Sequence, residues 1–350
     1  MVRFTDIINL EDGKEEKQGP AKEEAGEEKL WFTNTELISL KKDEEAPKSS
    51  GELARDSEEE IASCYDRLVE RQREVAERVK GSKGVSPSPI LADLHHVIEK
   101  GLINHLYDYA ALVPAGQQDL ETHAVAVTFG ALKIGKGMEY DIRPLLKLSL
   151  AAFLGHVGMY RIPEEVWNRE IELDGEDIEL LRRHPEFSHE ILSQLGRQYQ
   201  WLAEIVLQIH ERADGSGYPK GLSGGDILEE ASIIGLMDTY VSLINDRGQR
   251  KRLIQPDAVK YIITRQRGLF PPKVLKVFLN QISLFPVGTM VRLNNKHVGR
   301  VVSTNEKQPL RPVIEILFHS QGNRLQGKES IRLSENPLLY ITQGIDERDL

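Results

Sequence analysis

The feature that most constrains the fold is the long stretch 90–284, in which apolar residues recur at three- and four-residue spacings. That spacing places apolar side chains on one face of an α-helix, and no alternating strand pattern interrupts it. Amphipathic helices in series bury these faces against one another. The stretch therefore predicts an all-helical domain.

The helical periodicity and the Gly and Pro residues between segments set the expected helices. They cover residues 90–112, 119–135, 142–154, 175–195, 198–211, 229–246, 256–266 and 272–282. A charged helix is also expected over residues 51–80. Its narrow apolar stripe consists of Ile61, Cys64, Leu68 and Val75. This helix could pair with a copy of itself in a homodimer.

The pattern changes to period two at residue 285. The expected strands are residues 290–293, 298–302, 313–318 and 338–342. The turn at 294–296 joins the first two strands as a hairpin. The fold class is thus mainly α, with a small C-terminal β module. The expected parts are a leader at 1–50, a charged helix and linker at 51–89, the helical domain at 90–284 and the β module at 285–350.

Acidic charge is concentrated at the N-terminal end. The formal net charge is -10, and residues 1–60 hold 9 basic and 18 acidic side chains, against 36 and 37 in the remainder. Residues 1–50 have too little apolar surface to form a core, so we expect a mostly disordered leader. Its apolar island at 30–40 could be a short strand or a docking peptide for a protein partner. The nearly neutral body lacks the basic surface that duplex nucleic acid requires, but a small anionic ligand needs only a few arginines.

Cysteine content and hydropathy indicate the cellular compartment of the chain. Cys64 is the only cysteine, so neither an intrachain disulfide nor a cysteine-based zinc site can form. No run approaches the roughly 18 apolar residues of a membrane span. These observations favour a reducing, cytoplasmic setting.

The most specific motif is segment 210–222, which reads His-Glu-Arg-Ala-Asp-Gly-Ser-Gly-Tyr-Pro-Lys-Gly-Leu. His210, a metal-ligand type, stands at the end of an expected helix, and the following glycines let the backbone approach a ligand closely. By composition alone, the segment is also consistent with a structural turn after a core histidine.

Segment 210–222 resembles the loop of the HD-GYP family, a branch of the HD superfamily of metal-dependent phosphohydrolases whose members hydrolyse cyclic di-GMP. The resemblance covers about residues 119–283. The other family landmarks follow in order: His123 in Glu-Thr-His, His184 in Arg-His-Pro-Glu, Asp238 in Met-Asp-Thr-Tyr, Arg247 and Arg250 at an arginine-bearing helix end, and a Phe-Pro-Pro turn at 270–272.

The chain departs from the family pattern at the name-giving His-Asp pair. Aligned without a gap from Ile162-Pro163, Gly155 stands at the histidine and His156 at the bridging aspartate. Met159 stands where a lysine normally contacts substrate phosphate. Sliding the alignment to make His156 the histidine puts Val157 at the aspartate. Either alignment removes the bridging carboxylate. The tandem histidine before the loop is also reduced, to Ile209-His210.

The resemblance implies a set of site residues. The metal ligands would be His123, His156, His184, His210 and Asp238, and the nucleotide would contact Asp214, Gly217, Tyr218, Pro219, Arg247 and Arg250. Three or four such ligands suffice for one transition metal ion, iron, manganese or zinc. A bridged pair of ions lacks its shared carboxylate. Asp119, four residues before His123, is a candidate to replace a glutamate ligand found in some members.

Three functions remain open. The first is a catalytically degenerate HD-GYP-like protein that acts as a receptor for cyclic di-GMP or a related nucleotide, or as an interaction scaffold with the loop as its contact surface. The second is an active cyclic di-GMP phosphodiesterase, or a hydrolase for a related nucleotide, that uses one or two metal ions in an atypical site. The third is a structural role in which the leader and the β module carry the interaction. The complete loop favours the first two, and loss of the His-Asp pair favours the first over the second.

Overall fold

The structure is a computed structural model. It describes residues 50–112, 119–167, 175–245, 252–282, 284–305, 308, 310–321 and 323–346. The leader and its apolar island lie outside the described residues, as do Arg247 and Arg250. Among the helices of the described part, none combines the length and the apolar character that a membrane crossing requires.

The charged helix expected near the N-terminus is α3 (Ser50–Lys80). Cys64, Leu68 and Val75 of its expected stripe are buried, while Ile61 is half-buried. The helix packs against α5 and α6 of the same chain, so these helices cover its apolar stripe.

The helical part follows the order expected from the sequence. Its longer helices are α4 (Pro87–Glu99), α5 (Ile103–Leu112), α6 (Leu120–Gly137), α7 (Ile142–Phe153), α9 (Gly175–Arg182), α10 (His184–Ser193), α11 (Gln200–Leu207), α12 (Glu229–Leu243), α13 (Gln255–Arg265) and α14 (Pro272–Gln281). Short elements join them: α8 (Glu164–Trp167) and the 3-10 helices η1 (Val157–Arg161), η2 (Arg197–Tyr199), η3 (Gly224–Asp226) and η4 (Arg267–Leu269).

Two of the expected helices are each broken into two. The stretch 90–112 breaks between α4 and α5, where Gly101 has φ +69°, a conformation that glycine adopts without steric cost. The stretch 175–195 breaks at Arg183, because Pro185 in the first turn of α10 cannot donate a hydrogen bond to a preceding helical turn. The expected single helices were wrong at these two points, although the helical assignment of the flanking residues holds.

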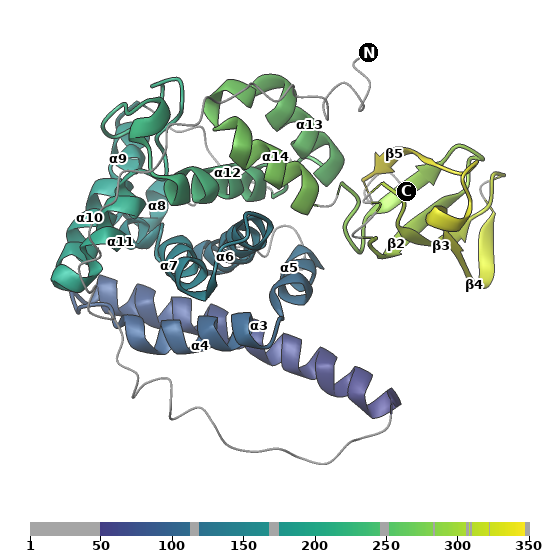
Figure 1. Ribbon diagram of the computed structural model, residues 1–350, viewed down its shortest axis with the longest axis horizontal. Helices are drawn as coiled ribbons and strands as arrows, with labels where there is room; N and C mark the ends of the chain where they lie inside the picture. Colours follow the sequence, from purple (N-terminus) through teal and green to yellow (C-terminus); the bar gives the residue numbers. More distant parts are fainter. Residues whose placement is uncertain are drawn as a thin grey trace, which may run out of the picture. The chain divides into compact units, whose positions relative to one another are not determined.

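The centre of the helical part is α6. It is buried on nearly every side, as an all-round apolar helix must be. Figure 1 shows α6 and α7 between α3 and α4 on one side and α12 and α14 on the other. Ligand-type side chains on α6 and α12 are therefore held in a close-packed frame.

The C-terminal part is an antiparallel five-stranded sheet in the order β4-β3-β2-β1-β5 (Figure 1). Its strands are β1 (Met290–Leu293), β2 (Val298–Ser303), β3 (Val313–Phe318), β4 (Arg324–Arg332) and β5 (Ile341–Ile345), with the 3-10 helix η5 (Leu333–Glu335) after β4. The predicted hairpin is β1–β2. β4 is not among the predicted strands, and β5 begins three residues after the predicted start at 338. The mainly helical fold class with a small β module is confirmed.

Candidate metal centre and ligand loop

Five side chains from five different segments converge on one point of the helical part. They are His123 on α6, His156 at the start of η1, His184 at the start of α10, His210 after α11, and Asp238 on α12. These are the five metal ligands implied by the sequence. The chain thus brings together residues that are more than a hundred positions apart.

The Asp238 carboxylate is the electrostatic centre of this histidine cluster. The His123 Nε2–H donates to Asp238 Oδ1 over 2.8 Å. The Nε2 atom of His156 lies 3.2 Å from the same oxygen, and the Nδ1 atom of His210 lies 3.9 Å from Oδ2. On the far side, the Nε2 atoms of His184 and His210 are 2.9 Å apart.

Contacts within the cluster, together with burial, shift the pKa values of Asp238 and His210. Burial by itself raises the pKa of the Asp238 carboxyl, but His156, His123 and His210 outweigh it and hold that pKa well below its usual range. Burial, helped by the nearby His184, lowers the pKa of His210 well below its usual value. Asp238 is therefore ionised and His210 neutral at neutral pH, which is the state in which each can bind a metal.

A backbone carbonyl orients the His184 ring. Its Nδ1–H donates to the Leu181 carbonyl oxygen over 2.7 Å, which leaves the lone pair of Nε2 facing the cluster. A backbone carbonyl behind a histidine is the usual way in which metal ligands are oriented.

The donor set fits a transition metal ion. Two groups of three have ligand atoms within 4.8 Å of one another: His156, His184 and His210, and His123, His156 and Asp238. Both ring nitrogens of His156 are buried and have no hydrogen-bond partner in the described part of the chain, because the short approach of Nε2 to Asp238 lacks hydrogen-bond geometry. Buried polar atoms without partners are unusual in proteins and are expected where an ion binds.

Apolar side chains surround positions 155 and 159, while the Gly158 backbone N–H donates to the Ser188 hydroxyl over 2.8 Å. A Cβ on Gly155 would lie 2.8 Å from Ile209 Cδ1, so the Ile209 side chain fills the space beside Gly155. Met159 is buried in an apolar cluster with Ile162 and Val166. The positions where the family pattern has a histidine and a lysine are thus built into the core.

The loop after His210 keeps an ordered architecture. The Tyr218 ring stacks on the His210 ring, with centroids 5.0 Å apart and planes at 3°. A Cβ on Gly217 would be 2.4 Å from the Arg212 backbone nitrogen, so only glycine fits there. Pro219 is half-buried, whereas Asp214 is exposed and accepts hydrogen bonds from the Ser216 backbone N–H and hydroxyl. Asp214, Gly217, Tyr218 and Pro219 therefore lie in one loop beside the cluster.

Two residues outside the predicted set contribute to this loop. The buried carboxylate of Glu211 accepts from the backbone N–H groups of Lys220 and Leu222, at 2.7 and 2.9 Å. The exposed Arg182 guanidinium lies 5.6 Å from the centroid of the Tyr218 ring. Glu211 follows His210 directly in the motif, which was its only signal, and nothing in the local sequence around Arg182 pointed to the loop.

Asp119 does not join the cluster. Its side chain caps α6 by accepting from the Thr122 backbone N–H over 2.8 Å, a common role of aspartate at a helix start. The suggestion that it replaces a glutamate ligand was wrong.

Comparison with known families divides the chain into two matched regions. Residues 105–274 match the family model described as HD domain. Residues 290–350 match a KOW domain associated with HD domain. The first match contains all five cluster residues and the loop, and the second contains the sheet.

Several similar proteins carry cyclic di-GMP phosphodiesterase names. The chain is 27% identical over 233 residues, 66% of this chain and 56% of the relative, to such an enzyme of Pseudomonas aeruginosa. It is 28% identical over 198 residues, 56% of this chain and 52% of the relative, to cyclic di-GMP phosphodiesterase PdeB of Borreliella burgdorferi. The matches thus span about half the length of these relatives. A solved HD-GYP-type protein of Bdellovibrio bacteriovorus is 19% identical, with a TM-score of 0.40 over 66% of this chain and 80% of that one.

The class defined by fold and site is an HD-domain protein with a histidine-rich centre. Together with the loop at 210–222, the relatives narrow this class, because the matched region is similar to HD-GYP proteins.

Proposed function

We propose that this protein is a cyclic di-GMP signalling protein of HD-GYP type with a degenerate catalytic centre, which binds its nucleotide without turning it over efficiently. The observation that carries the proposal is the identity of residue 156. Either alignment of the segment leaves the bridging position without a carboxylate, with His156 or Val157 in its place, and Asp238 is the only carboxylate in either candidate ligand group of the described chain.

The number of ions follows from the chemistry of that imidazole. Both ligand groups include His156. A neutral imidazole has one lone pair on one ring nitrogen, so it binds one ion at a time, whereas a carboxylate has two oxygens and can bridge two ions. We therefore propose one iron, manganese or zinc ion per chain. A bound ion of this kind would supply an activated water, but a single ion does not clamp both the attacking and the leaving oxygen of a phosphodiester.

The loop supplies the proposed nucleotide contacts. Tyr218 presents an aromatic face that is already oriented by His210, and Arg182 adds a positive charge over the same ring. The roles of Asp214, Gly217 and Pro219 as contacts, and of Arg247 and Arg250 as phosphate ligands, remain predictions from the sequence. Met159, buried among apolar side chains, offers no charge to a phosphate.

An active phosphodiesterase with an atypical site is the second candidate. It is favoured by the retained cluster itself, because His156 keeps two buried nitrogens that no hydrogen bond satisfies. A protein partner bound through the loop would be compatible with either candidate.

Metal analysis, calorimetry with cyclic di-GMP and a hydrolysis assay on the same preparation test the proposal. We expect about one metal equivalent, nucleotide binding, and turnover far below the roughly 1 per second of ordinary enzymes. Two tightly held equivalents, or turnover at that ordinary rate, would establish the second candidate instead. No binding heat would refute the receptor role.

Variants of the loop separate a nucleotide from a protein ligand. Arg182→Gln should weaken cyclic di-GMP binding about tenfold if the guanidinium meets phosphate. Tyr218→Ala should weaken either ligand, because it removes the aromatic contact. Arg197→Gln, a change on η2 outside the loop, is the matched control and should leave binding unchanged.

A further inference from the structure

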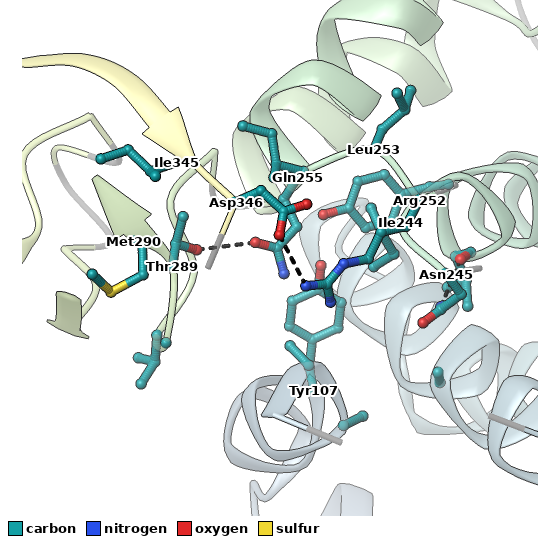
Figure 2. A pocket seen from close by; sticks show the side chains of 18 of the residues that line it. Tyr107, Ile244, Asn245, Arg252, Leu253, Gln255, Thr289, Met290, Ile345 and Asp346 are labelled. Carbon is teal, nitrogen blue, oxygen red and sulfur yellow. Dashed lines mark hydrogen bonds and ion pairs between the residues drawn. The ribbon is translucent and has the colours of Figure 1, made fainter. Parts of the chain in front are cut away.

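A cavity of about 400 Å³ lies between the helical part and the sheet. Its walls come from α5, α6 and α12, from the segment that leads into α13, and from β1, β2 and the end of β5. Figure 2 shows side chains from the helices and from the sheet facing one another across it. None of the five cluster residues lines this cavity, so it is separate from the histidine cluster.

Two polar contacts hold the walls together. The Arg252 Nη2 atom lies 3.6 Å from Asp346 Oδ1. The Thr289 hydroxyl donates to Gln255 Oε1 over 3.0 Å, which leaves the amide N–H groups of Gln255 as the hydrogen-bonding groups it offers to the cavity. Both contacts are drawn in Figure 2, where each joins a residue of the helical part to one of the sheet region.

A buried hydroxyl in the wall makes no hydrogen bond of ordinary geometry with the described residues. Tyr240 is 1% exposed, and only the Tyr107 hydroxyl interacts with its Oη, as a weak contact that affects the pKa of both phenols. Burial raises the pKa of the Tyr240 and Tyr107 phenols, so both hydroxyls keep their protons. A buried donor that is left unsatisfied is costly, and a ligand acceptor would satisfy it.

The described lining carries several side-chain donors: the hydroxyls of Tyr107 and Tyr240, the Gln255 amide, and the guanidinium groups of Arg252 and Arg300. The Asn245 amide nitrogen already donates to Val241 O over 2.8 Å. Among the described lining residues, two guanidinium groups and the Asp346 carboxylate give a positive formal charge. The remaining lining is mostly aliphatic, from Ile244 and Leu253 on one side to Val287, Met290 and Ile345 on the other.

This combination defines a ligand type. We propose that the cavity between the helical part and the sheet is a binding site for a small organic anion, a molecule with an acceptor-rich acidic group and an apolar body. The acidic group would meet the Arg252 guanidinium and the Tyr240 hydroxyl, and the apolar body would lie against the aliphatic walls. The volume is in the range of small-molecule pockets, which are lined mainly by apolar groups with a few polar ones.

The fluorescent anion 8-anilinonaphthalene-1-sulfonate is a suitable probe, because it joins a sulfonate to an apolar aromatic body and brightens in apolar surroundings. Titrated against the full chain, it should show one saturable site. N-phenyl-1-naphthylamine, which has the same aromatic body without the sulfonate, should bind more weakly. Equal affinity for the two probes would overturn the proposed anion selectivity, and absence of a saturable site would overturn the binding site.

Two substitutions locate the probe. Tyr240→Phe removes only the hydroxyl and should weaken binding about fivefold. Arg252→Gln should weaken it about tenfold or more, because a charge-assisted contact is lost. The matched controls are Tyr261→Phe and Arg265→Gln on α13, which do not line the cavity and should leave the affinity unchanged.

Circular dichroism melting checks that each variant is folded. Because Arg252 also pairs with Asp346, its replacement could loosen the contact between the helical part and the sheet, and Tyr240→Phe then remains the deciding variant. Unchanged affinity for the sulfonate probe in a folded Tyr240→Phe and in Arg300→Gln would place the probe elsewhere and refute the proposal.

Discussion

The loop at 210–222 and the segment at 155–159 flank the same histidine cluster, yet they differ in construction. The loop is held by polar contacts, chiefly the Glu211 carboxylate and the Tyr218 ring on His210. The segment at 155–159 is surrounded mainly by apolar side chains, with Met159 in an apolar cluster and Ile209 beside Gly155, and its Gly158 N–H donates to the Ser188 hydroxyl over 2.8 Å. The loop therefore forms a polar wall beside the cluster, and the segment at 155–159 with Ile209 forms an apolar wall. Two sides of one cluster can thus be built from different kinds of contact.

The largest expected effect concerns the residue that stands between the two walls. His156→Ala should reduce bound metal from about one equivalent to nearly none, because both ligand groups depend on His156. His123→Ala should retain partial binding through His156, His184 and His210. Metal analysis after dialysis measures both, with the half-buried His189→Ala on α10 as control. An equal loss of bound metal in the two variants would show that the two ligand groups do not bind metal independently.

Placing the family's residues at 155, 156, 159 and 209 should produce the next largest effect, an increase in hydrolysis. Gly155→His, His156→Asp, Met159→Lys and Ile209→His together should raise cyclic di-GMP hydrolysis at least about tenfold, or ~1.4 kcal/mol of barrier. The changes return a bridging carboxylate and a phosphate-binding lysine. The same chain with Met159 left unchanged separates the metal effect from the lysine effect. Activity no higher than that of the natural chain would show that further groups are missing.

Glu211 provides a test of the polar wall. Glu211→Gln replaces one acceptor oxygen by a donor, so one of the two loop N–H groups loses its partner, and the free energy of unfolding should fall by about 1–3 kcal/mol. Asp214→Asn in the same loop is exposed and should change stability by less than about 0.5 kcal/mol. Urea unfolding of both variants makes the comparison. Similar values for the two would contradict the role of Glu211 in holding the loop.

The apolar wall allows a coupling test of similar or smaller size. Gly155→Ala should destabilise the fold by about 1–3 kcal/mol, because its methyl group meets Ile209. Ile209→Val removes the contacting Cδ1 atom, so the double variant should be more stable than the sum of the single changes predicts. Thermal or urea unfolding of the four chains gives the coupling free energy. Strict additivity would refute the contact.

The smallest effect is a titration in the loop. The Ser216 hydroxyl, and then the Ser216 backbone N–H, lower the pKa of Asp214. Because the folded pKa is depressed, the contribution to stability is present above the unfolded pKa and is lost as the pH falls through the folded pKa. Ser216→Ala should raise the Asp214 pKa part of the way to its ordinary value, since the backbone N–H remains. Carboxyl titration by NMR measures the shift, and an unchanged pKa would contradict the hydroxyl contact.

Sequence periodicity predicted the helices well because their apolar faces are long and regular. It missed β4, which lies at an edge of the sheet and pairs only with β3. The sequence of β4, Arg-Leu-Gln-Gly-Lys-Glu-Ser-Ile-Arg, has only two apolar side chains, so it lacked the alternating signal of a half-buried strand.

The site was predictable where a motif carried it. His123, His156, His184, His210 and Asp238 were chosen by their order along the chain, and the fold brings them together. Arg182 was not predicted, because its position over the Tyr218 ring depends on how α9 leads into α10. The cavity beside Tyr240 was equally hidden, since its walls combine residues from both ends of the helical part with the sheet.

The packing of Ile209 into the space beside Gly155 also bears on the history of the chain. A single mutation that returned a large side chain at 155 would meet Ile209 before any metal ligand was gained. A single return to histidine at 209 would place a polar ring in the core without a partner, which is costly. Selection for stability would disfavour both single changes, so the family's histidine at 155 is costly to reach one substitution at a time. Coordinated substitutions at 155 and 209 would avoid both costs.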